Sequence, residues 1–330
     1  MSADRPDPTE QHPEGEHGEL AEREQELAAA EARTGSRRAA EALSDVPSEP
    51  GAAKPDAVLL ADDVSRSFGG LRAVHVDHLE VQRGTITALI GPNGAGKSTF
   101  FNLVTGFDRP DTGTWSFDGH RLTGMAAYQI AKMGMVRTFQ LTKALMRLTA
   151  LENVMLGATD QRGEHFLPSM FRPSWRQQEK KIEARADELL ERFTLTRMRD
   201  DFAGIMSGGQ RKLLEMARAL MVRPSMLLLD EPIAGVNPAL AQSLLGHIES
   251  LRDEGMTIVL VEHNMDVVMG ISDWIVCFAE GEVIAEGRPE DIRTNPKVIE
   301  AYLGTSPGEV GSSSSGDGTS TGEPQEETIS

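Results

Sequence analysis

The chain has 330 residues, of which 39% are hydrophobic, and its formal net charge at pH 7 is −18. This length is typical of one large domain or two small ones, and the hydrophobic content suffices for a buried core. The sequence contains no run of about 18 apolar residues and no apolar signal segment, so we expect neither a membrane-spanning helix nor a secretory leader. The single cysteine, Cys277, excludes an internal disulfide and fits a reducing compartment.

The acidic charge is concentrated at the two ends of the chain. Residues 1–56 carry a net charge of −8 and residues 305–330 a net charge of −5, which leaves −5 for residues 57–304. Such a balance argues against nucleic acid as the main partner. We predict a disordered acidic extension over 1–56, partly helical between residues 19 and 43, and a disordered acidic tail over 305–330. A docking helix within the first segment is the alternative.

Residues 57–304 begin with the alternation of an α/β domain. Residues 58–68 are predicted to form a strand that ends in a turn at Gly69 and Gly70. Residues 85–90, TITALI, are typical of a short strand buried on both faces. A helix is expected to start in the glycine-rich loop that follows and to continue to Val104.

That loop, GPNGAGKST at residues 91–99, fits the phosphate-binding pattern G-x-x-x-x-G-K-[ST]. A row of backbone N–H groups and a helix N-terminus would meet the negative oxygens of a triphosphate. Lys97 adds a positive charge for the β and γ oxygens, and Ser98 offers a hydroxyl to Mg²⁺. A chance glycine-rich turn would not need to stand between a buried strand and a helix.

The alternation of strands and helices then stops. Residues of about 141–222 are helical in character, and residues 177–193 carry the clearest stripe of apolar side chains at helical spacing. The simplest account is a helical subdomain inserted into the α/β domain.

This helical region ends in the run SGGQ, residues 207–210, which is predicted to open a helix over residues 211–221. Ser207 is a favourable N-cap, and that alone would explain the serine. The sharper interpretation is a second anion site, because a helix N-terminus carries partial positive charge. A chain with one phosphate-binding loop could use this site on a nucleotide held by another subunit.

Two carboxylates close the next buried strand, MLLLDE at residues 226–231. Asp230 is placed to hold Mg²⁺, and Glu231 to polarise a water molecule that attacks the γ-phosphate. Phosphoryl transfer needs positioning and charge neutralisation more than covalent chemistry, so these are the parts we expect. A further strand at 257–261 leads to His263, and residues 275–278 and 282–285 are predicted to form an antiparallel hairpin.

Over about residues 57–304 the chain resembles the ATP-binding subunit of an ABC transporter. The resemblance rests on four motifs in a fixed order: the loop 91–99, SGGQ, the Asp-Glu pair and His263. The resemblance implies a P-loop NTPase fold with a RecA-like core, an antiparallel β subdomain and an inserted helical subdomain. It also implies that Phe68 stacks on adenine and that Gln140 contacts Mg²⁺ and water. His263 would contact the γ-phosphate.

The residues implied in ATP binding are Phe68, Gly91, Pro92, Asn93, Gly94, Ala95, Gly96, Lys97, Ser98, Thr99, Gln140, Ser207, Gly208, Gly209, Gln210 and Asp230. Those implied in Mg²⁺ binding are Ser98, Gln140 and Asp230, and those implied in catalysis are Glu231, His263, Gln140 and Lys97. One departure is Met206, where the family usually has leucine, a change between apolar side chains of similar volume.

The runs RTFQ (137–140), LENV (151–154), DEPIAGVNP (230–238) and VEHNMDVVM (261–269) are similar to importers of branched-chain amino acids. The resemblance implies an ATPase that lies peripherally on the cytoplasmic face of the cell membrane. Its partners would be two membrane-embedded permeases, a second ATPase subunit in a heterodimer or homodimer, and indirectly an external solute-binding protein. Urea or short-chain amide importers, lipopolysaccharide-export ATPases and soluble ABC ATPases remain alternatives.

Overall fold

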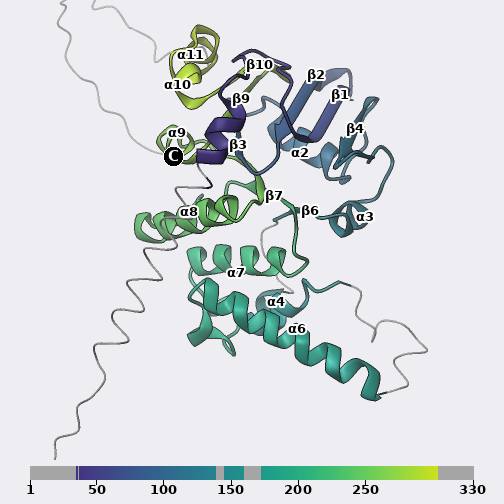
Figure 1. Cartoon of the computed structure of the whole chain (residues 1–330), viewed down its shortest axis with the longest axis vertical. Helices are drawn as coiled ribbons and strands as arrows, with labels where there is room; N and C mark the ends of the chain where they lie inside the picture. Colours follow the sequence, from purple (N-terminus) through teal and green to yellow (C-terminus); the bar gives the residue numbers. More distant parts are fainter. Residues whose placement is uncertain (1–34, 36, 139–144, 160–171, 304–330) are drawn as a thin grey trace, which may run out of the picture.

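The computed structural model describes residues 35, 37–138, 145–159 and 172–303. Figure 1 shows two sheets with their flanking helices in the upper part of the molecule and a group of helices below them. The predicted end segments lie mostly outside the described residues, as does Gln140.

The larger sheet has six strands, and parallel neighbours form its centre. In spatial order its strands are β10 (Glu282–Gly287), β9 (Trp274–Ala279), β3 (Ile86–Ile90), β8 (Thr257–Val261), β7 (Met226–Asp230) and β6 (Met135–Arg137). Every residue of β3 and β8 is buried, as expected for strands covered on both faces. Only β10 runs antiparallel to its neighbour, in the hairpin that the sequence predicts.

The smaller sheet is antiparallel. Its order is β2 (Leu71–Gln82), β1 (Ala57–Phe68), β4 (Thr112–Phe117) and β5 (His120–Arg121). Helix α2 (Lys97–Val104) carries buried side chains that join this sheet and the larger one in one apolar cluster. Helix α3 (Ala127–Lys132) precedes β6.

The four helices that the structure describes after β7 in the chain flank the larger sheet. They are α8 (Pro238–Asp253), α9 (Met265–Ile271), α10 (Pro289–Arg293) and α11 (Pro296–Leu303). Cys277 is buried in β9, and burial raises the pKa of its thiol to about 12. This sulfur is therefore a core side chain and not a reactive group.

The lower group consists of α4 (Ala150–Met155), α6 (Arg172–Arg192) and α7 (Gly208–Leu220), which pack on one another. Short 3₁₀ turns lie before and between them: η1 (Leu145–Arg147), η3 (Thr196–Met198) and η4 (Ala203–Ile205). Leu189, Leu190 and Phe193 are buried in this group, so the predicted stripe is its core. No helix within the described ranges combines the length and the apolar character needed to cross a bilayer.

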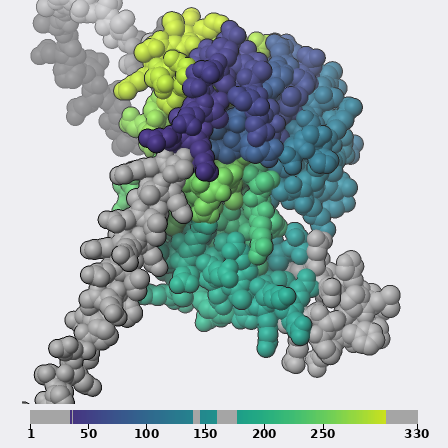
Figure 2. Space-filling model, viewed as in Figure 1, coloured from purple at the N-terminus to yellow at the C-terminus, as the bar shows by residue number. Residues whose placement is uncertain are grey.

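Residues 37–56 differ from the expected solvated extension. Residues 37–43 are helical, and Leu43, Val46 and Ala52 are buried among side chains of both sheets. We call residues 37–56 the N-terminal strap. Figure 2 shows it in purple, seated between the yellow C-terminal helices and the blue strands of the smaller sheet.

Polar contacts fix the strap at both borders. The Glu286 carboxylate of β10 accepts the Ala52 N–H at 2.7 Å, and the Glu80 carboxylate of β2 accepts the Lys54 N–H at 2.6 Å. The Lys54 ammonium, itself buried, lies 3.4 Å from Glu286 and 4.4 Å from the centre of the Trp274 ring. The strap is thus an integral layer of the fold.

Candidate functional site

The loop between β3 and α2 has the shape that the phosphate-binding pattern predicts. Gly91 and Gly96 have φ values of 139° and 98°. A Cβ at Gly91 would lie 2.1 Å from the Phe278 carbonyl oxygen, and one at Gly96 would lie 2.5 Å from the Ala73 carbonyl oxygen. Both positions therefore require glycine for two reasons, the left-handed backbone and the close approach of another strand.

Lys97 begins helix α2, and its side chain folds back over the loop. The ammonium donates hydrogen bonds to the carbonyl oxygens of Gly91 at 2.7 Å and Pro92 at 2.9 Å. Burial lowers the pKa of Lys97 below its ordinary value of 10.5, while Glu231 and Asp230 lie close enough to oppose this shift. The positive charge is thus at the mouth of the loop, as phosphate binding requires.

A cavity of about 180 Å³ opens over this loop. Its lining residues are Ala73, Asn93, Gly94, Ala95, Gly96, Lys97, Ser98, Thr99, Glu231, Val261 and His263. The structure therefore brings most of the predicted loop together with Glu231 and His263, which lie more than 130 positions away in the sequence. They meet because β3, β7 and β8 are parallel and end at one edge of the sheet.

Glu231 and His263 are in direct contact. The His263 Nε2 atom lies 2.7 Å from the Glu231 Oε1 atom, and each side chain is somewhat less than half exposed. A carboxylate held by an imidazole at the edge of a phosphate-binding loop can accept a proton from a water molecule while staying oriented.

The backbone of Glu231 is unusual. Its φ is 46°, a left-handed value that costs a non-glycine residue of order 1–3 kcal/mol. The Glu231 N–H donates to the Val261 carbonyl at 3.0 Å, and its carbonyl accepts the Lys212 ammonium at 3.3 Å. The strained turn at Glu231 is therefore held from β8 and from helix α7. The sequence alone did not single out Lys212.

Asp230 ends β7, and its carboxylate accepts a hydrogen bond from the Arg137 Nη2 atom at 2.7 Å. Arg137, at the end of the neighbouring strand β6, also bonds the Asn102 side chain at 2.6 Å. In the sequence Arg137 stands out only as part of the run RTFQ, because the carboxylate that it contacts lies 93 positions later in the chain.

The donor set fits Mg²⁺. Hydroxyl and carboxylate oxygens, here Ser98 and Asp230, are the ligands that this ion prefers. The Asp230 carboxylate already lies beside positive charge in the structure. Arg137 forms an ion pair with it, and Lys97 is close enough to interact with it electrostatically. Gln140, the third predicted ligand, lies outside the described residues.

The SGGQ run caps helix α7. The Ser207 hydroxyl accepts the Gln210 N–H at 3.3 Å, and the Gln210 side chain accepts the Ser207 N–H at 2.8 Å. Gly209 allows close packing of α7 on α8, since a Cβ there would lie 2.1 Å from a Leu240 methyl carbon. Ser207 and Gly208 are exposed, and none of the residues 207–210 lines the cavity over the loop.

Phe68 lies at the end of β1, where its ring is half exposed. The Arg66 guanidinium lies 4.7 Å from the centre of this ring. Phe68 is not among the lining residues of the cavity, so its predicted contact with adenine stays a prediction.

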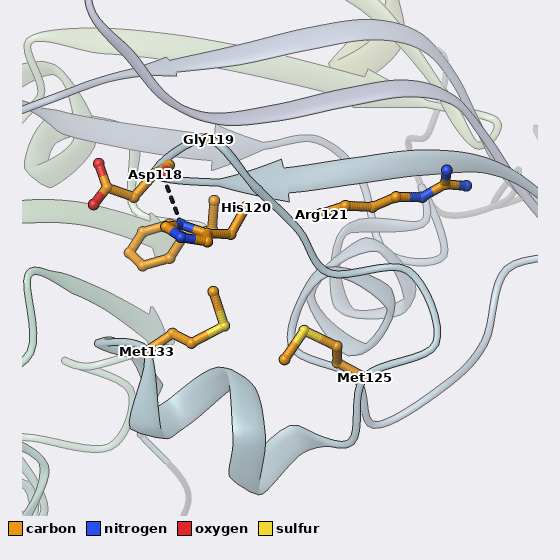
Figure 3. Close-up of a pocket in the computed structure, with 7 residues that line it drawn as sticks. Asp118, Gly119, His120, Arg121, Met125 and Met133 are labelled. Atoms are coloured by element: carbon orange, nitrogen blue, oxygen red, sulfur yellow. Dashed lines mark hydrogen bonds between the residues drawn. The ribbon is translucent and has the colours of Figure 1, made fainter.

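A second hollow, of about 640 Å³, lies between the β4–β5 hairpin and α3. In Figure 3 the side chains of Met125 and Met133 point into it from the side of α3, opposite His120. His120 is held by its Nδ1 atom, 2.8 Å from the Asp118 carbonyl. Among the described residues, none of those predicted for ATP binding lines this hollow, which is therefore separate from the cavity over the phosphate-binding loop.

The two sheets, the loop on α2 and the capped helix α7 define an ATP-binding cassette. The family model described as ABC transporter matches residues 74–234, and the one described as branched-chain amino acid ATP-binding cassette transporter matches residues 282–307. The chain belongs to the ABC transporter family and is an ATPase of that family. The predictions of family, fold class and enzyme class are confirmed.

Two relatives and one solved structure illustrate the likeness. The probable branched-chain amino acid transport ATP-binding protein LivG of Archaeoglobus fulgidus is 42% identical over 77% of this chain and 98% of its own length. The high-affinity branched-chain amino acid transport ATP-binding protein BraF of Pseudomonas aeruginosa is 41% identical over 75% and 98%. A crystal structure of the ADP conformation of an ABC transporter cassette is 37% identical with a TM-score of 0.67, covering 75% of this chain and 99% of that one.

Proposed function

We propose that this chain binds and hydrolyses ATP to energise an importer of branched-chain amino acids. Two facts support this substrate class. Relatives about 40% identical over nearly their whole length are named for branched-chain amino acid transport. The matching C-terminal residues 282–307 carry the description of the same type of transporter.

The observation that carries the proposal is the contact of His263 with Glu231 at the cavity over the phosphate-binding loop. Glu231 accepts the proton of the attacking water, and His263 keeps the carboxylate oriented toward the γ-phosphate. Lys97 neutralises charge on the phosphate oxygens. Ser98, Asp230 and Gln140 would hold Mg²⁺, which supplies further positive charge to the β and γ oxygens.

Two ATPase subunits act together in this proposal. The exposed SGGQ cap of α7 does not line the cavity of its own chain, so we assign the partial positive charge of this helix N-terminus to a nucleotide bound by a second ATPase subunit. Closure of two subunits over two nucleotides would then drive the transporter between its access states, because ATP binds the closed form more tightly.

The remaining partners are two membrane-embedded permeases and, indirectly, a solute-binding protein outside the membrane. We place this chain peripherally on the cytoplasmic face of the membrane. Affinity purification of the tagged chain from gently solubilised membranes should recover the permeases and the second ATPase, and the co-purifying binding protein should bind leucine, isoleucine or valine. A binding protein that takes urea or amides instead would overturn the substrate class, and recovery without permeases would favour a soluble ATPase.

The catalytic roles are tested by Glu231→Gln. The variant keeps the shape of the side chain but loses the base, so we expect normal ATP binding and a loss of steady-state hydrolysis of about 10²- to 10⁴-fold. With Mg²⁺ and ATP it should accumulate as a closed dimer, measured by light scattering. Adding Ser207→Arg should disperse that dimer, because the new side chain obstructs the cap.

Normal hydrolysis by Glu231→Gln would remove this residue from its proposed role. A nucleotide-dependent dimer that survives Ser207→Arg would contradict the use of the SGGQ cap across the subunit interface.

A further inference from the structure

Glu262 is a buried carboxylate directly behind the catalytic pair. It stands between the last residue of β8 and His263, and only 4% of its surface is exposed. Its Oε1 atom accepts the Ile233 N–H at 3.2 Å, and its Oε2 atom accepts the His263 N–H at 3.3 Å. One side chain therefore bonds the backbone on both sides of the Glu231–His263 contact.

These two bonds join the ends of neighbouring strands. Asp230 on β7 pairs with Val261 on β8, so the turns that follow the two strands lie side by side. Glu231 and Ile233 belong to the first turn and His263 follows the second. Since Glu231 has a strained φ of 46°, its turn needs external bonds to keep one conformation.

Stability alone does not account for a charged group at this position. Burial raises the pKa of Glu262 above its ordinary value, and the nearby Glu231 carboxylate adds to the shift. No ion pair between Glu262 and a lysine or arginine is found in residues 37–138, 145–159 and 172–303. Burial of a carboxylate without a lysine or arginine partner costs free energy, which its two backbone bonds and the nearby His263 ring offset in part.

We propose that Glu262 is a positioning residue for ATP hydrolysis, which holds the backbones of Ile233 and His263 so that the imidazole stays within hydrogen-bond distance of Glu231. The inference rests on the proposed catalytic roles of Glu231 and His263. It predicts that Glu262 acts on turnover through that contact and not on nucleotide binding.

The first test is Glu262→Gln. The amide keeps the size of the side chain, but its nitrogen is a donor, so at most one of the two backbone N–H groups keeps its acceptor. We expect kcat to fall by about 10- to 100-fold, as for a small misplacement of catalytic groups, with the KM for ATP changed less than about twofold. Glu262→Asp, which keeps the charge and withdraws the carboxylate by one methylene, should lower kcat as well.

Glu286→Gln is the matched control. It alters another buried glutamate that accepts a backbone N–H, but this one lies on β10 beside the strap. The control should lower the melting temperature and leave kcat unchanged. Unchanged kcat in folded Glu262→Gln and Glu262→Asp, or an equal loss of kcat in the control, would overturn the inference.

A double-mutant cycle with His263→Ala separates positioning from general damage. If Glu262 acts through the contact of His263 with Glu231, Glu262→Gln should lower kcat less than about twofold when His263 is already alanine. Fully multiplicative losses would contradict the proposal. Glu231→Gln with normal turnover would instead refute the underlying catalytic roles, so the two failures are distinguishable.

Discussion

Glu262 and Glu286 are two buried glutamates in different regions of the molecule, and each forms the same kind of hydrogen bond. Each accepts a backbone N–H from a segment distant in sequence, and burial raises the pKa of each. Glu286, however, lies 3.4 Å from the Lys54 ammonium and also accepts the Trp274 indole N–H at 3.3 Å. Glu262 has the Glu231 carboxylate as a charged neighbour.

The difference in charged neighbours indicates that Glu286 stabilises the fold, whereas Glu262 serves the proposed catalytic residues. At β10 the negative charge is matched by a cation brought in by the strap, so the two segments stabilise each other. At the end of β8 the charge stands beside another carboxylate, and its bonds define the shape of two turns instead. Changes near Glu286 should therefore alter the free energy of unfolding, and changes near Glu262 should alter turnover.

The largest stability effect is expected on removal of the strap. Deleting residues 1–50 removes Leu43 and Val46, which are 1% and 4% exposed in the intact chain. The apolar surface that these two side chains cover then becomes exposed to water. Burial of two such side chains contributes about 3–6 kcal/mol. The melting temperature should fall by roughly 10 °C, measured by calorimetry. Deleting only residues 1–34 is the control, and equal melting temperatures for the two deletions would show that the strap does not stabilise the fold.

A smaller loss is expected for Lys54→Met. The change leaves the Glu286 carboxylate buried without its cation, which costs about 3 kcal/mol in such pairs. Denaturant unfolding measures the loss, and kcat should stay unchanged. Adding Glu286→Gln should restore part of the stability because no unpaired charge then remains. A double variant as unstable as the sum of the single variants would show that the pair is not coupled.

The smallest effect concerns Asp273, a third buried carboxylate, which accepts the Ile86 N–H at 2.8 Å beside Arg252. Burial raises its pKa from 3.8 to about 6, against the opposing effect of Arg252. A raised pKa means that its contribution to stability is complete below pH 3.8 and is lost as the pH rises through about 6.

Wild type should therefore lose about 1 kcal/mol relative to Asp273→Asn between pH 5 and pH 7. Urea unfolding of the two proteins at both pH values measures this difference. The opposite sign would mean that the Arg252 cation, and not burial, controls the titration of Asp273.

Local patterns predicted the α/β core and the nucleotide loop well, because the physics there is short in range. Glycine at positions 91 and 96 follows from backbone geometry, and the parallel strands follow from buried apolar runs. The resemblance implied that Glu231 and His263 are both catalytic, and the structure adds that the two side chains are in contact. The catalytic role of this contact, like the roles of Phe68 and Gln140, stays a prediction.

The strap could not be predicted from its composition. Leu43 and Val46 are isolated apolar residues in an acidic stretch, and their partners lie on both sheets. Ala52 meets Glu286 more than 230 positions later. Arg137 and Lys212 were missed for the same reason, since each acquires its role from a strand or turn formed far along the chain. Sequence patterns show the periodicity of apolar side chains within a helix or strand, but they do not show which other element packs against those side chains.

The burial of Cys277 makes the chain well suited to site-directed labelling. Its one native thiol is enclosed in β9, and with a pKa of about 12 almost none of it is thiolate at neutral pH. A cysteine introduced at the exposed Ala234 would be the sole reactive sulfur, with no native cysteine to remove first. A maleimide dye or an oxidative cross-link at that position would then report how closely the turns after β7 approach in two associated chains.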